Sequence, residues 1–371
     1  LQRTANIHLV YNSEPDELGG GEMSRFIKQI QQELPIYNPA IRITEQLLTT
    51  QPVVGQAYPP ILIPKTESVK DAMLTRAQKG LAPTSLNAYR KCPLRFYFSA
   101  IARIEEAKET EETINPAILG SAVHEVLYQL YLPFKGLTLR PDDVSAMLPK
   151  VPEMTDQAFT KVIPGTDLAY GKNLLLVSVA KIMITNFLKE EKEQIEKLES
   201  LGTGLTIHLL EEPVRKIMEI RSGDEKVEVT IKGFVDRVDG YHNVVRIIDY
   251  KTGKVEPKEL KMETWDALLD KPGLDKGFQL LTYAWLLGKD FSSVGRELES
   301  GLIVMNKLKS WFMPMNLPGE KIIKIDSNAL QEYEAVLSTI LEEIFDPEVP
   351  FSQTSDITVC ELCPYITLCG R

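Results

Sequence analysis

Residues 233–237 (GFVDR) and 247–253 (IIDYKTG) decide the fold of this chain. Each stretch places one aspartate after β-branched or aromatic residues, a composition typical of a buried strand. Twelve residues separate Asp236 from Asp249, and the Asp239-Gly240 dipeptide between them predicts a tight hairpin turn. A hairpin of this length brings both carboxylates to neighbouring positions on adjacent strands.

The two aspartates indicate either a metal site or a buried ion pair. Asp249 and Lys251 stand two residues apart, so their side chains share one face of an extended strand. A carboxylate among Val and Ile residues is excluded from a sheet interior unless it is paired or binds a metal. Hard oxygen ligands suit Mg²⁺ or Mn²⁺, and a nearby lysine orients a water or neutralises developing phosphorane charge. Taken alone, the residues fit a buried Asp249–Lys251 ion pair equally well.

Regular elements extend on both sides of this hairpin. The periodicity of apolar residues predicts helices over residues 84–100, 116–131, 171–200, 276–287 and 328–344. It predicts strands over residues 205–220, 226–238, 243–250, 301–306 and about 322–325, with a turn at 222–224. Helices followed by a three-stranded meander, a helix and a strand predict an α/β unit with a mixed sheet.

The first 75 residues differ in character from the rest. The predicted elements there are a strand over 6–12, a turn at the three glycines 19–21, a helix over 22–34 and a strand near 61–63. Six prolines between Pro35 and Pro64 interrupt regular structure. We therefore expect a boundary near residue 75, followed by an α/β domain over residues 76–371.

The composition describes an acidic globular chain. Its 371 residues exceed what one core usually carries, so two domains or one elaborated domain are expected. The net charge of -10 argues against a protein coated in positive charge and leaves room for a local basic groove. Without a long apolar run or a leader-like start, the sequence predicts a cytoplasmic protein. Because the chain begins at Leu1, we expect it to be part of a longer polypeptide.

Polar residues on two predicted helices complete a pattern. His124 follows Gly120 by four residues on one helix, and Gln279 and Tyr283 stand at i and i+4 on another. Taken alone, His124 is most simply a structural residue. Gln279 and Tyr283 alone are most simply polar residues on a helix face that packs against the core. Together the blocks Gly-x-x-x-His, Gly-x-x-Asp-Arg, Asp-x-Lys and Gln-x-x-x-Tyr closely resemble the PD-(D/E)XK nuclease superfamily. The match is to its RecB/AddB-type branch, which includes the adaptation nucleases of CRISPR systems.

The resemblance implies a restriction-endonuclease-like core, in which helices flank a mixed β-sheet, with helical insertions. It implies a metal shell made of His124, Asp236, Asp249 and the backbone carbonyl of Tyr250. Lys251 is then expected to position or activate the attacking water. Gln279 and Tyr283 are expected to support the site or to contact the DNA backbone.

The expected activity is Mg²⁺- or Mn²⁺-dependent hydrolysis of DNA, as an exonuclease in end processing and recombinational repair. The alternative is a catalytically silent DNA-binding or scaffolding module of a helicase–nuclease complex. Residues 6–34 resemble the closing strand and helix of a helicase-like module, so residues 1–75 are expected to be a helicase-like remnant and linker. The family also implies an AddA-like helicase partner and no membrane association.

The four cysteines indicate a second metal centre. Cys92 precedes the nuclease blocks, and Cys360, Cys363 and Cys369 close the chain as C-x2-C-x5-C. Four thiolates suit a zinc ion or an iron–sulfur cluster, and three cysteines in the last twelve residues do not fit ordinary core packing. The spacing also resembles the iron–sulfur staple of AddB-type nuclease domains. That resemblance implies a structural [4Fe–4S] cluster, with zinc as the alternative.

Basic residues flank the first cysteine. Arg90, Lys91 and Arg95 interleave with the aromatic residues of segment 89–98, a mixture expected of a DNA contact. Most of those aromatic residues are better explained as the core-facing side of an amphipathic helix than as DNA contacts. We predict DNA contacts for the three basic residues only.

Overall fold

The computed structural model describes residues 6–10, 23–46, 59–104, 114–223, 225–270, 272–292, 296–306, 311–319 and 323–371. The chain divides into two compact units, Leu1–Tyr58 and Pro59–Arg371. The larger unit begins ahead of the boundary expected near residue 75, because helix α2 (Glu67–Lys79) packs on its sheet. Buried Met73 and Ala77 of α2 belong to the main hydrophobic core.

The smaller unit contains helix α1 (Arg25–Tyr37), three residues later than the predicted helix over 22–34. The Ser24 hydroxyl caps it by accepting a hydrogen bond from the Phe26 amide at 3.3 Å. None of the helix residues is buried. Residues 6–10 form no strand, and the remainder of that predicted strand, with the turn at 19–21, lies outside the described residues.

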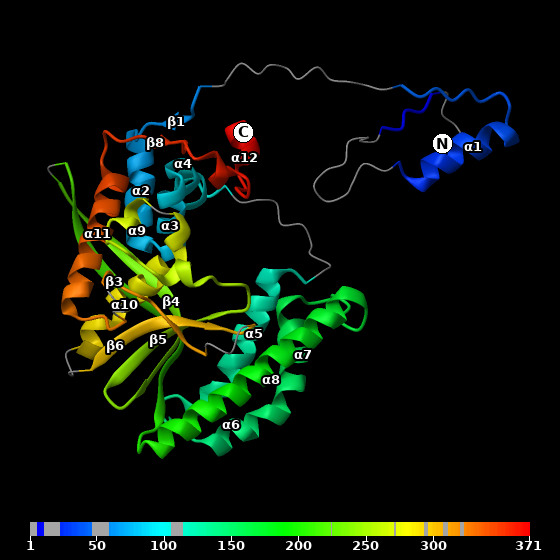
Figure 1. The fold of residues 1–371 in the computed structure, drawn as a ribbon. Coiled ribbons are helices and arrows are strands. Elements are labelled where there is room, and N and C mark those ends of the chain that lie inside the picture. Colours follow the sequence, from blue (N-terminus) through cyan, green and yellow to red (C-terminus); the bar gives the residue numbers. More distant parts are fainter. Residues whose placement is uncertain are drawn as a thin grey trace. The chain divides into compact units, whose positions relative to one another are not determined.

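The larger unit is built on a six-stranded sheet in the order β2-β3-β4-β5-β6-β7 (Figure 1). Its strands are β2 (Thr138–Leu139), β3 (Leu205–Ser222), β4 (Glu225–Tyr241), β5 (Val244–Lys251), β6 (Glu297–Val304) and β7 (Met313–Pro314). Strands β3, β4 and β5 form an antiparallel meander, and β6 pairs in parallel with β5. The predicted α/β architecture with a mixed sheet is confirmed.

Two predicted features of the sheet are wrong. Asp239 and Gly240 lie inside β4, and the turn falls three residues later, at His242 and Asn243, where His242 has a φ of 50°. Asp239 is drawn into the strand because it is buried in ion pairs with Arg237 and Arg246. The strand expected near 322–325 is also not formed over its described residues, where Ile325 makes one isolated bridge to Leu298.

Helices cover both faces of the sheet (Figure 1). One face packs against α2, α3 (Pro83–Lys91), α10 (Asp275–Ser292) and α11 (Ser327–Phe345), which share the larger core cluster. The other packs against α5 (Pro116–Tyr131), α6 (Pro141–Met147), α7 (Val151–Val162) and α8 (Gly171–Ser200), which form a second cluster. Helices α5 and α8 match their predicted bounds, whereas α2, α6 and α7 were not predicted.

The helix predicted over 84–100 is divided at Cys92. Helix α3 ends at Lys91, and α4 (Pro93–Phe96) runs directly into a π-helical turn over Tyr97–Ile101. Cys92 is extended, with a φ of -163°, because the following proline disfavours the helical conformation of the preceding residue. The break turns Cys92 out of the helix and toward the C-terminal segment, where Ser352 accepts a contact from its Sγ at 3.9 Å.

The C-terminal segment is made of short elements. Strand β8 (Phe351–Ser352) pairs with β1 (Leu62–Ile63), and a 3-10 turn (Ile357–Cys360) leads to α12 (Ile366–Cys369). The remaining short elements are α9 (Ala267–Asp270) and 3-10 turns at Leu132–Phe134, Leu148–Lys150, Pro257–Leu260 and Pro272–Leu274. Pairing of β1 with β8 fastens the end of the chain next to the start of the unit.

Helix α8 has the length and composition of a membrane span. One 18-residue window has a mean hydropathy of 1.2, and 39% of it is buried within the molecule. The buried residues, including Phe187 and Leu188, pack against α5, α6 and α7. This is the pattern of a core helix, which passes the same test.

Candidate active site

The site forms where two strands of the sheet separate. Pairing between β4 and β5 ends at Arg237 and Ile248, so beyond this point the two strands no longer pair with each other, while Asp249 and Tyr250 stay paired with β6. Asp236 fills this gap, because its Oδ2 accepts a hydrogen bond from the backbone N–H of Tyr250 at 2.8 Å. The side chain of Asp236 is 10% exposed. The open strand end thus holds a nearly buried carboxylate in one position.

Helix α5 brings His124 to this carboxylate. The Nδ1 atom of His124 lies 3.5 Å from Asp236 Oδ2, and its Nε2 lies 3.1 Å from the backbone carbonyl oxygen of Tyr250. Three of the four ligands implied by the family resemblance therefore meet. Their roles as metal ligands remain predictions.

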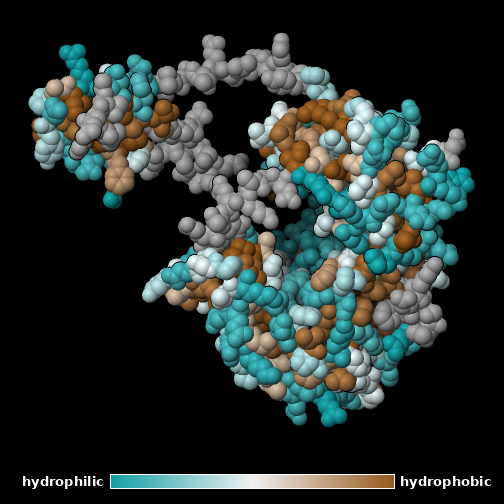
Figure 2. Space-filling view, turned by 180° about the vertical axis from the view of Figure 1, so that it is seen from behind, coloured by the Kyte–Doolittle hydropathy of each residue, from teal (hydrophilic) through white to brown (hydrophobic). Residues whose placement is uncertain are grey.

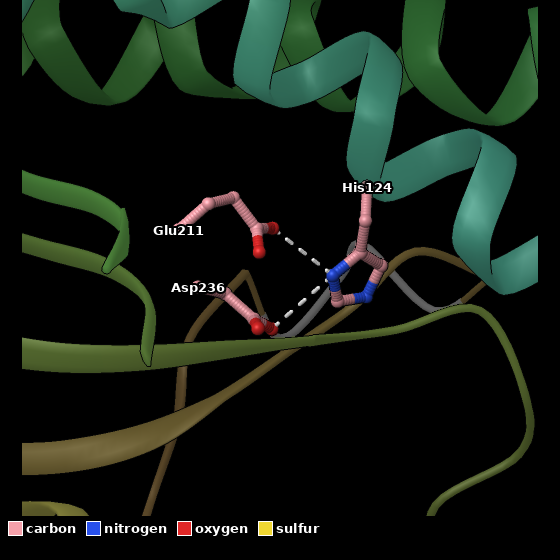
Figure 3. A group of neighbouring side chains, drawn as sticks. All are labelled: His124, Glu211 and Asp236. Carbon is pink, nitrogen blue, oxygen red and sulfur yellow. Dashed lines mark hydrogen bonds and ion pairs between the residues drawn. The ribbon is translucent and has the colours of Figure 1, made fainter. Parts of the chain in front are cut away.

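A further carboxylate, missed in the sequence, completes this cluster. Glu211 of β3 lies between Leu210 and Glu212, whose register partners on β4 are Arg237 and Val235, and its Oε1 is 3.3 Å from His124 Nδ1. Ligand atoms of the three residues lie within 4.8 Å of one another (Figure 3). Glu211 has a φ of 45°, which a non-glycine residue rarely adopts, close to a bulge at Ile207 and Leu209. The available sequence signal was the Glu211-Glu212 pair inside an apolar strand.

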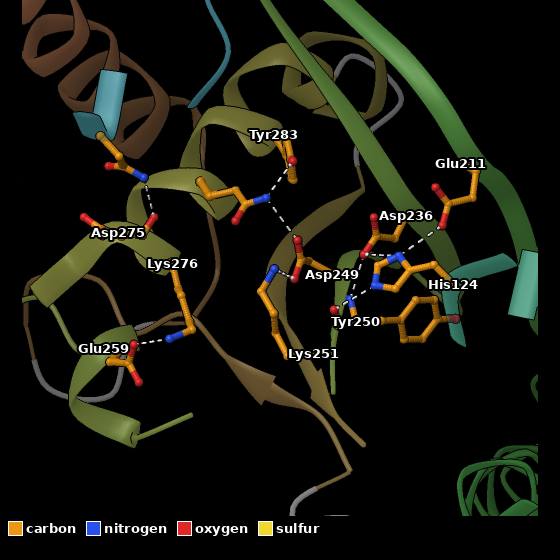
Figure 4. Close-up of polar contacts among 12 residues, drawn as sticks. His124, Glu211, Asp236, Asp249, Tyr250, Lys251, Glu259, Asp275, Lys276 and Tyr283 are labelled. Carbon is orange, nitrogen blue, oxygen red and sulfur yellow. Dashed lines mark hydrogen bonds and ion pairs between the residues drawn. The ribbon is translucent and has the colours of Figure 1, made fainter. Parts of the chain in front are cut away.

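Asp249 lies beside this cluster and faces α10. Its Oδ1 accepts a hydrogen bond from Gln279 Nε2 at 3.1 Å, and the Lys251 ammonium lies 2.6 Å from its Oδ2 (Figure 4). Gln279 also donates to the hydroxyl of Tyr283 at 2.8 Å. A side chain at Gly233 would come within 2.6 Å of the Tyr283 ring, so only glycine fits this approach. Predicted residues from four blocks therefore meet in one place.

The charge balance of the site favours an added cation. Burial and the charge of Asp249 raise the pKa of Asp236 to about 8. Burial lowers the pKa of His124, but the hydrogen bond with Glu211 and the charges of Asp236 and Glu211 outweigh it and raise that pKa to about 9. The carboxylates therefore repel one another and hold protons that a metal would replace.

The residues present fit a divalent metal. Asp249 Oδ2 is buried and accepts no hydrogen bond from the described residues, with Lys251 as its ion-pair partner. Carboxylate oxygens, a carbonyl oxygen and one imidazole are the donor set that Mg²⁺ or Mn²⁺ accepts. Figure 2 shows a recess lined by hydrophilic residues on the face of the molecule seen there. A buried carboxylate oxygen held only by an ion pair in such a donor set is what a cation would stabilise.

A buried ion network supports the site from behind. Arg237 pairs with Glu191 of α8 and with Asp239, both at 2.7 Å, and donates to the Tyr250 hydroxyl at 3.2 Å. Arg237 and Glu191 are fully buried. Burial raises the pKa of the Glu191 carboxyl, and the charge of Arg237 opposes that shift. The network fixes Tyr250, whose backbone contacts both His124 and Asp236.

The four cysteines line one pocket of the larger unit, together with Arg95 and Tyr365. Within the described residues, no three cysteine sulfurs lie within 4.8 Å of one another. Tetrahedral zinc, with Zn–S bonds of about 2.3 Å, holds its sulfurs about 3.8 Å apart. Burial raises the pKa of the Cys369 thiol, and the neighbouring Cys363 and Cys92 add to the shift. The pocket gathers all four thiols at a spacing wider than a formed zinc site.

The three basic residues predicted to contact DNA occupy different surroundings. The Arg90 side chain is 2% exposed, donates to Asn87 Oδ1 at 2.6 Å and stacks on Phe278. Lys91 pairs with Asp275 at the start of α10, and Arg95 lines the cysteine pocket. Arg90 is therefore used inside the fold, and the three residues do not form one basic surface.

Comparison with known proteins identifies the family. The sequence matches the PD-(D/E)XK nuclease superfamily over residues 80–370. No protein of curated function matches the chain. Among solved structures, the crystal structure of SSO0001 aligns with 15% identity and a TM-score of 0.23, over 77% of this chain and 95% of that one, a similarity too low to support an argument. The family match includes every element that builds the site and confirms the restriction-endonuclease-like fold, so this chain belongs to the PD-(D/E)XK nuclease superfamily.

Proposed function

We propose that this protein is a metal-dependent deoxyribonuclease that acts as an exonuclease in DNA end processing and recombinational repair. The observation that carries the proposal is the meeting of His124, Asp236 and Asp249 beside Lys251, at the point where β4 and β5 separate. Glu211 adds a carboxylate to the same cluster. Membership of a nuclease superfamily supports the chemistry, and the site supplies residues suited to it.

The side chains divide the work of phosphodiester hydrolysis. His124, Asp236, Asp249 and the Tyr250 carbonyl would hold Mg²⁺ or Mn²⁺, and the bound metal would supply Lewis-acid stabilisation of the phosphate. Lys251 orients a water for attack in line with the leaving 3′ oxygen, which gives 5′-phosphate ends. Gln279 holds the Asp249 carboxylate by a hydrogen bond and is itself held against Tyr283. Glu211 orients the His124 ring.

We propose that Cys92, Cys360, Cys363 and Cys369 hold a structural [4Fe–4S] cluster. Their shared pocket and the resemblance of their spacing in the sequence to an iron–sulfur staple support this proposal. Such a centre would tie the chain end to the segment that precedes the nuclease residues. Iron and sulfide analysis of anaerobically purified protein tests it, and colourless protein that contains zinc would contradict it.

The N-terminal unit enters the proposal only through the family resemblance. We propose that residues 1–58 are a helicase-like remnant, and the AddA-like helicase partner stays a prediction. Apolar side chains of α1 such as Phe26 and Ile36 are 63% and 76% exposed, as in a helix taken out of a larger core. Co-purification with a helicase subunit tests this part.

A cleavage assay tests the proposed activity. End-labelled single strands and duplexes with blunt or recessed ends are incubated with Mg²⁺, Mn²⁺ or EDTA. We expect metal-dependent release of products with 5′ phosphates, starting from an end. DNA binding without cleavage in either metal would instead support the catalytically silent module.

A further inference from the structure

Beyond the end of β5, the β3–β4 hairpin presents one face to solvent. Strand β5 pairs only with residues 237–241 of β4, while β3 and β4 continue as a pair to Ser222 and Glu225. Val227, Val229, Ile231 and Val235 of β4 are buried in the core that α10 covers. The alternate residues point to the opposite side. This open face starts at the proposed metal site.

The side chains of the open face follow in pairs along the hairpin. Beyond the site, Pro213 and Phe234 form the first pair, and Arg215 and Lys232 the second. Phe234 is 50% exposed, and Pro213 and Arg215 are also exposed. An aromatic ring and then two cations therefore lie in line with the carboxylates of the site.

Two features of this surface are costly unless a nucleic acid covers them. A half-exposed phenylalanine leaves apolar area in water, although the chain buries most of its other phenylalanines. Arg215 lies directly opposite Lys232, and like charges at such a position destabilise a sheet. Lys232 is partly compensated, because its ammonium donates to the Lys79 carbonyl at 3.0 Å.

We propose that Phe234, supported by Pro213, forms a stacking platform for the nucleobase next to the scissile phosphate, and that Arg215 binds the following phosphate. Base stacking on an aromatic ring tolerates any sequence, and a guanidinium matches phosphate geometry. The substrate is therefore a strand that is single at this point, because a paired base is not available for stacking. This inference rests on the proposed nuclease function and deepens it.

The charges farther along this open face limit how many nucleotides of the strand can lie on the hairpin. After Ile217 and Thr230, the next pair is Glu219 and Glu228; Glu219 is paired with Lys226 at 2.6 Å, and Glu228 adds a carboxylate that repels a phosphate backbone. The strand therefore leaves the hairpin after the Arg215 pair. We expect the protein to contact two or three nucleotides beyond the scissile phosphate, estimated from this spacing of about 3.4 Å per strand residue.

A cycle of protein and DNA changes tests the stacking contact. The substrates are a single strand and its derivatives that each lack one base, placed successively from the labelled end. Phe234→Leu should raise KM for the intact strand about tenfold and change kcat less than about twofold. Removing the stacked base should raise KM of the parent protein by a similar factor, and the two changes combined should add nothing further.

Three controls make the result decisive. Phe234→Tyr should restore the parent KM, because the tyrosine ring also stacks. Leu175→Ala, at a 63% exposed apolar side chain on α8, should leave KM unchanged. The thermal midpoint of Phe234→Leu should match that of the parent. An unchanged KM in Phe234→Leu would overturn the proposal. So would a result in which Phe234→Leu and the loss of a base raise KM by factors that multiply, whichever base is removed.

The inference and the proposed function fail separately. Cleavage of the intact strand by the parent protein tests the function alone. If the parent does not cleave, the same cycle is measured as Kd from the fluorescence of 2-aminopurine in the strand, where stacking on Phe234 quenches emission. Loss of that quenching in Phe234→Leu supports the platform, and equal quenching in both proteins rejects it.

Discussion

The carboxylate site and the cysteine pocket are built to different degrees by the chain itself. The carboxylates come from long strands, and hydrogen bonds to the sheet or to α10 fix them, such as Asp236 to the Tyr250 amide at 2.8 Å. The cysteines lie on short turns, and their sulfurs make long contacts, such as Cys360 Sγ to the Asp356 carbonyl at 4.0 Å. The proposed metal ligands are therefore held in place by the sheet itself, whereas the cysteines would need the proposed centre to hold them together.

This difference predicts opposite results when each ion is removed. Loss of the divalent metal should end chemistry and leave the fold, because the sheet holds the ligands. Loss of the cysteine-bound centre should loosen the end of the chain and leave the ligands of the carboxylate site in place.

The largest effect is expected from Lys251→Ala. The lysine is the cation nearest to Asp249, so its removal should lower kcat by a factor on the order of 10⁴. Circular dichroism and iron content should be unchanged, because the side chain is 28% exposed and not part of the core. Lys181→Ala, which removes a surface pair with Asp156, is the matched control. Cleavage at the parent rate would remove Lys251 from the mechanism.

Cys360→Ser should act on stability instead. The centre would link Cys92 to the chain end across 267 intervening residues, and closing a loop of that size is worth about 5–6 kcal/mol in a chain-entropy estimate. We expect loss of iron and rapid proteolysis within residues 353–371, with cleavage of short strands retained. Thr367→Ser in the same segment should change none of these. Loss of cleavage at full stability would show that the two regions are not independent.

The buried network behind Tyr250 gives the next largest effect. Glu191→Gln removes the partner of fully buried Arg237 and should lower the free energy of unfolding by about 3 kcal/mol. Urea titration measures the change, and Glu193→Gln on the exposed side of α8 is the control. Equal stability of the two variants would mean that the network does not brace the site.

The smallest effect is the pH dependence of metal binding. In the metal-free site the pKa of Asp236 is about 8 and that of His124 about 9, so a metal must displace their protons at neutral pH. Apparent Mg²⁺ affinity should therefore rise up to about a hundredfold per pH unit below about pH 8, where both protons are displaced, and up to about tenfold per unit between about pH 8 and pH 9. Calorimetry in two buffers should detect proton release on binding. An affinity independent of pH would contradict these pKa shifts.

The sequence predicted the core elements well because their signals are local. The periodicity of apolar residues predicts helices α5 and α8 and the strands that carry Asp236 and Asp249. The order of the four motifs predicts that their polar side chains meet in one site. Glu211 was missed because its position depends on a bulge and a positive φ that one strand does not reveal. The predicted turn at Asp239 and Gly240 was wrong because the Asp239 carboxylate pairs with Arg246 of the neighbouring strand, which keeps Asp239 inside β4. Arg90 was predicted to contact DNA because a basic segment of sequence does not show which of its side chains are buried.

The measurement that tests the central claim most directly is cleavage of an end-labelled single strand across a Mn²⁺ titration, by the parent protein and by Asp249→Ala together. Both proteins are first checked for equal circular dichroism and equal metal content at the cysteines. We predict saturable, EDTA-sensitive cleavage by the parent and none by Asp249→Ala at any Mn²⁺ concentration. Equal cleavage by both, with contaminating nuclease excluded, would contradict it.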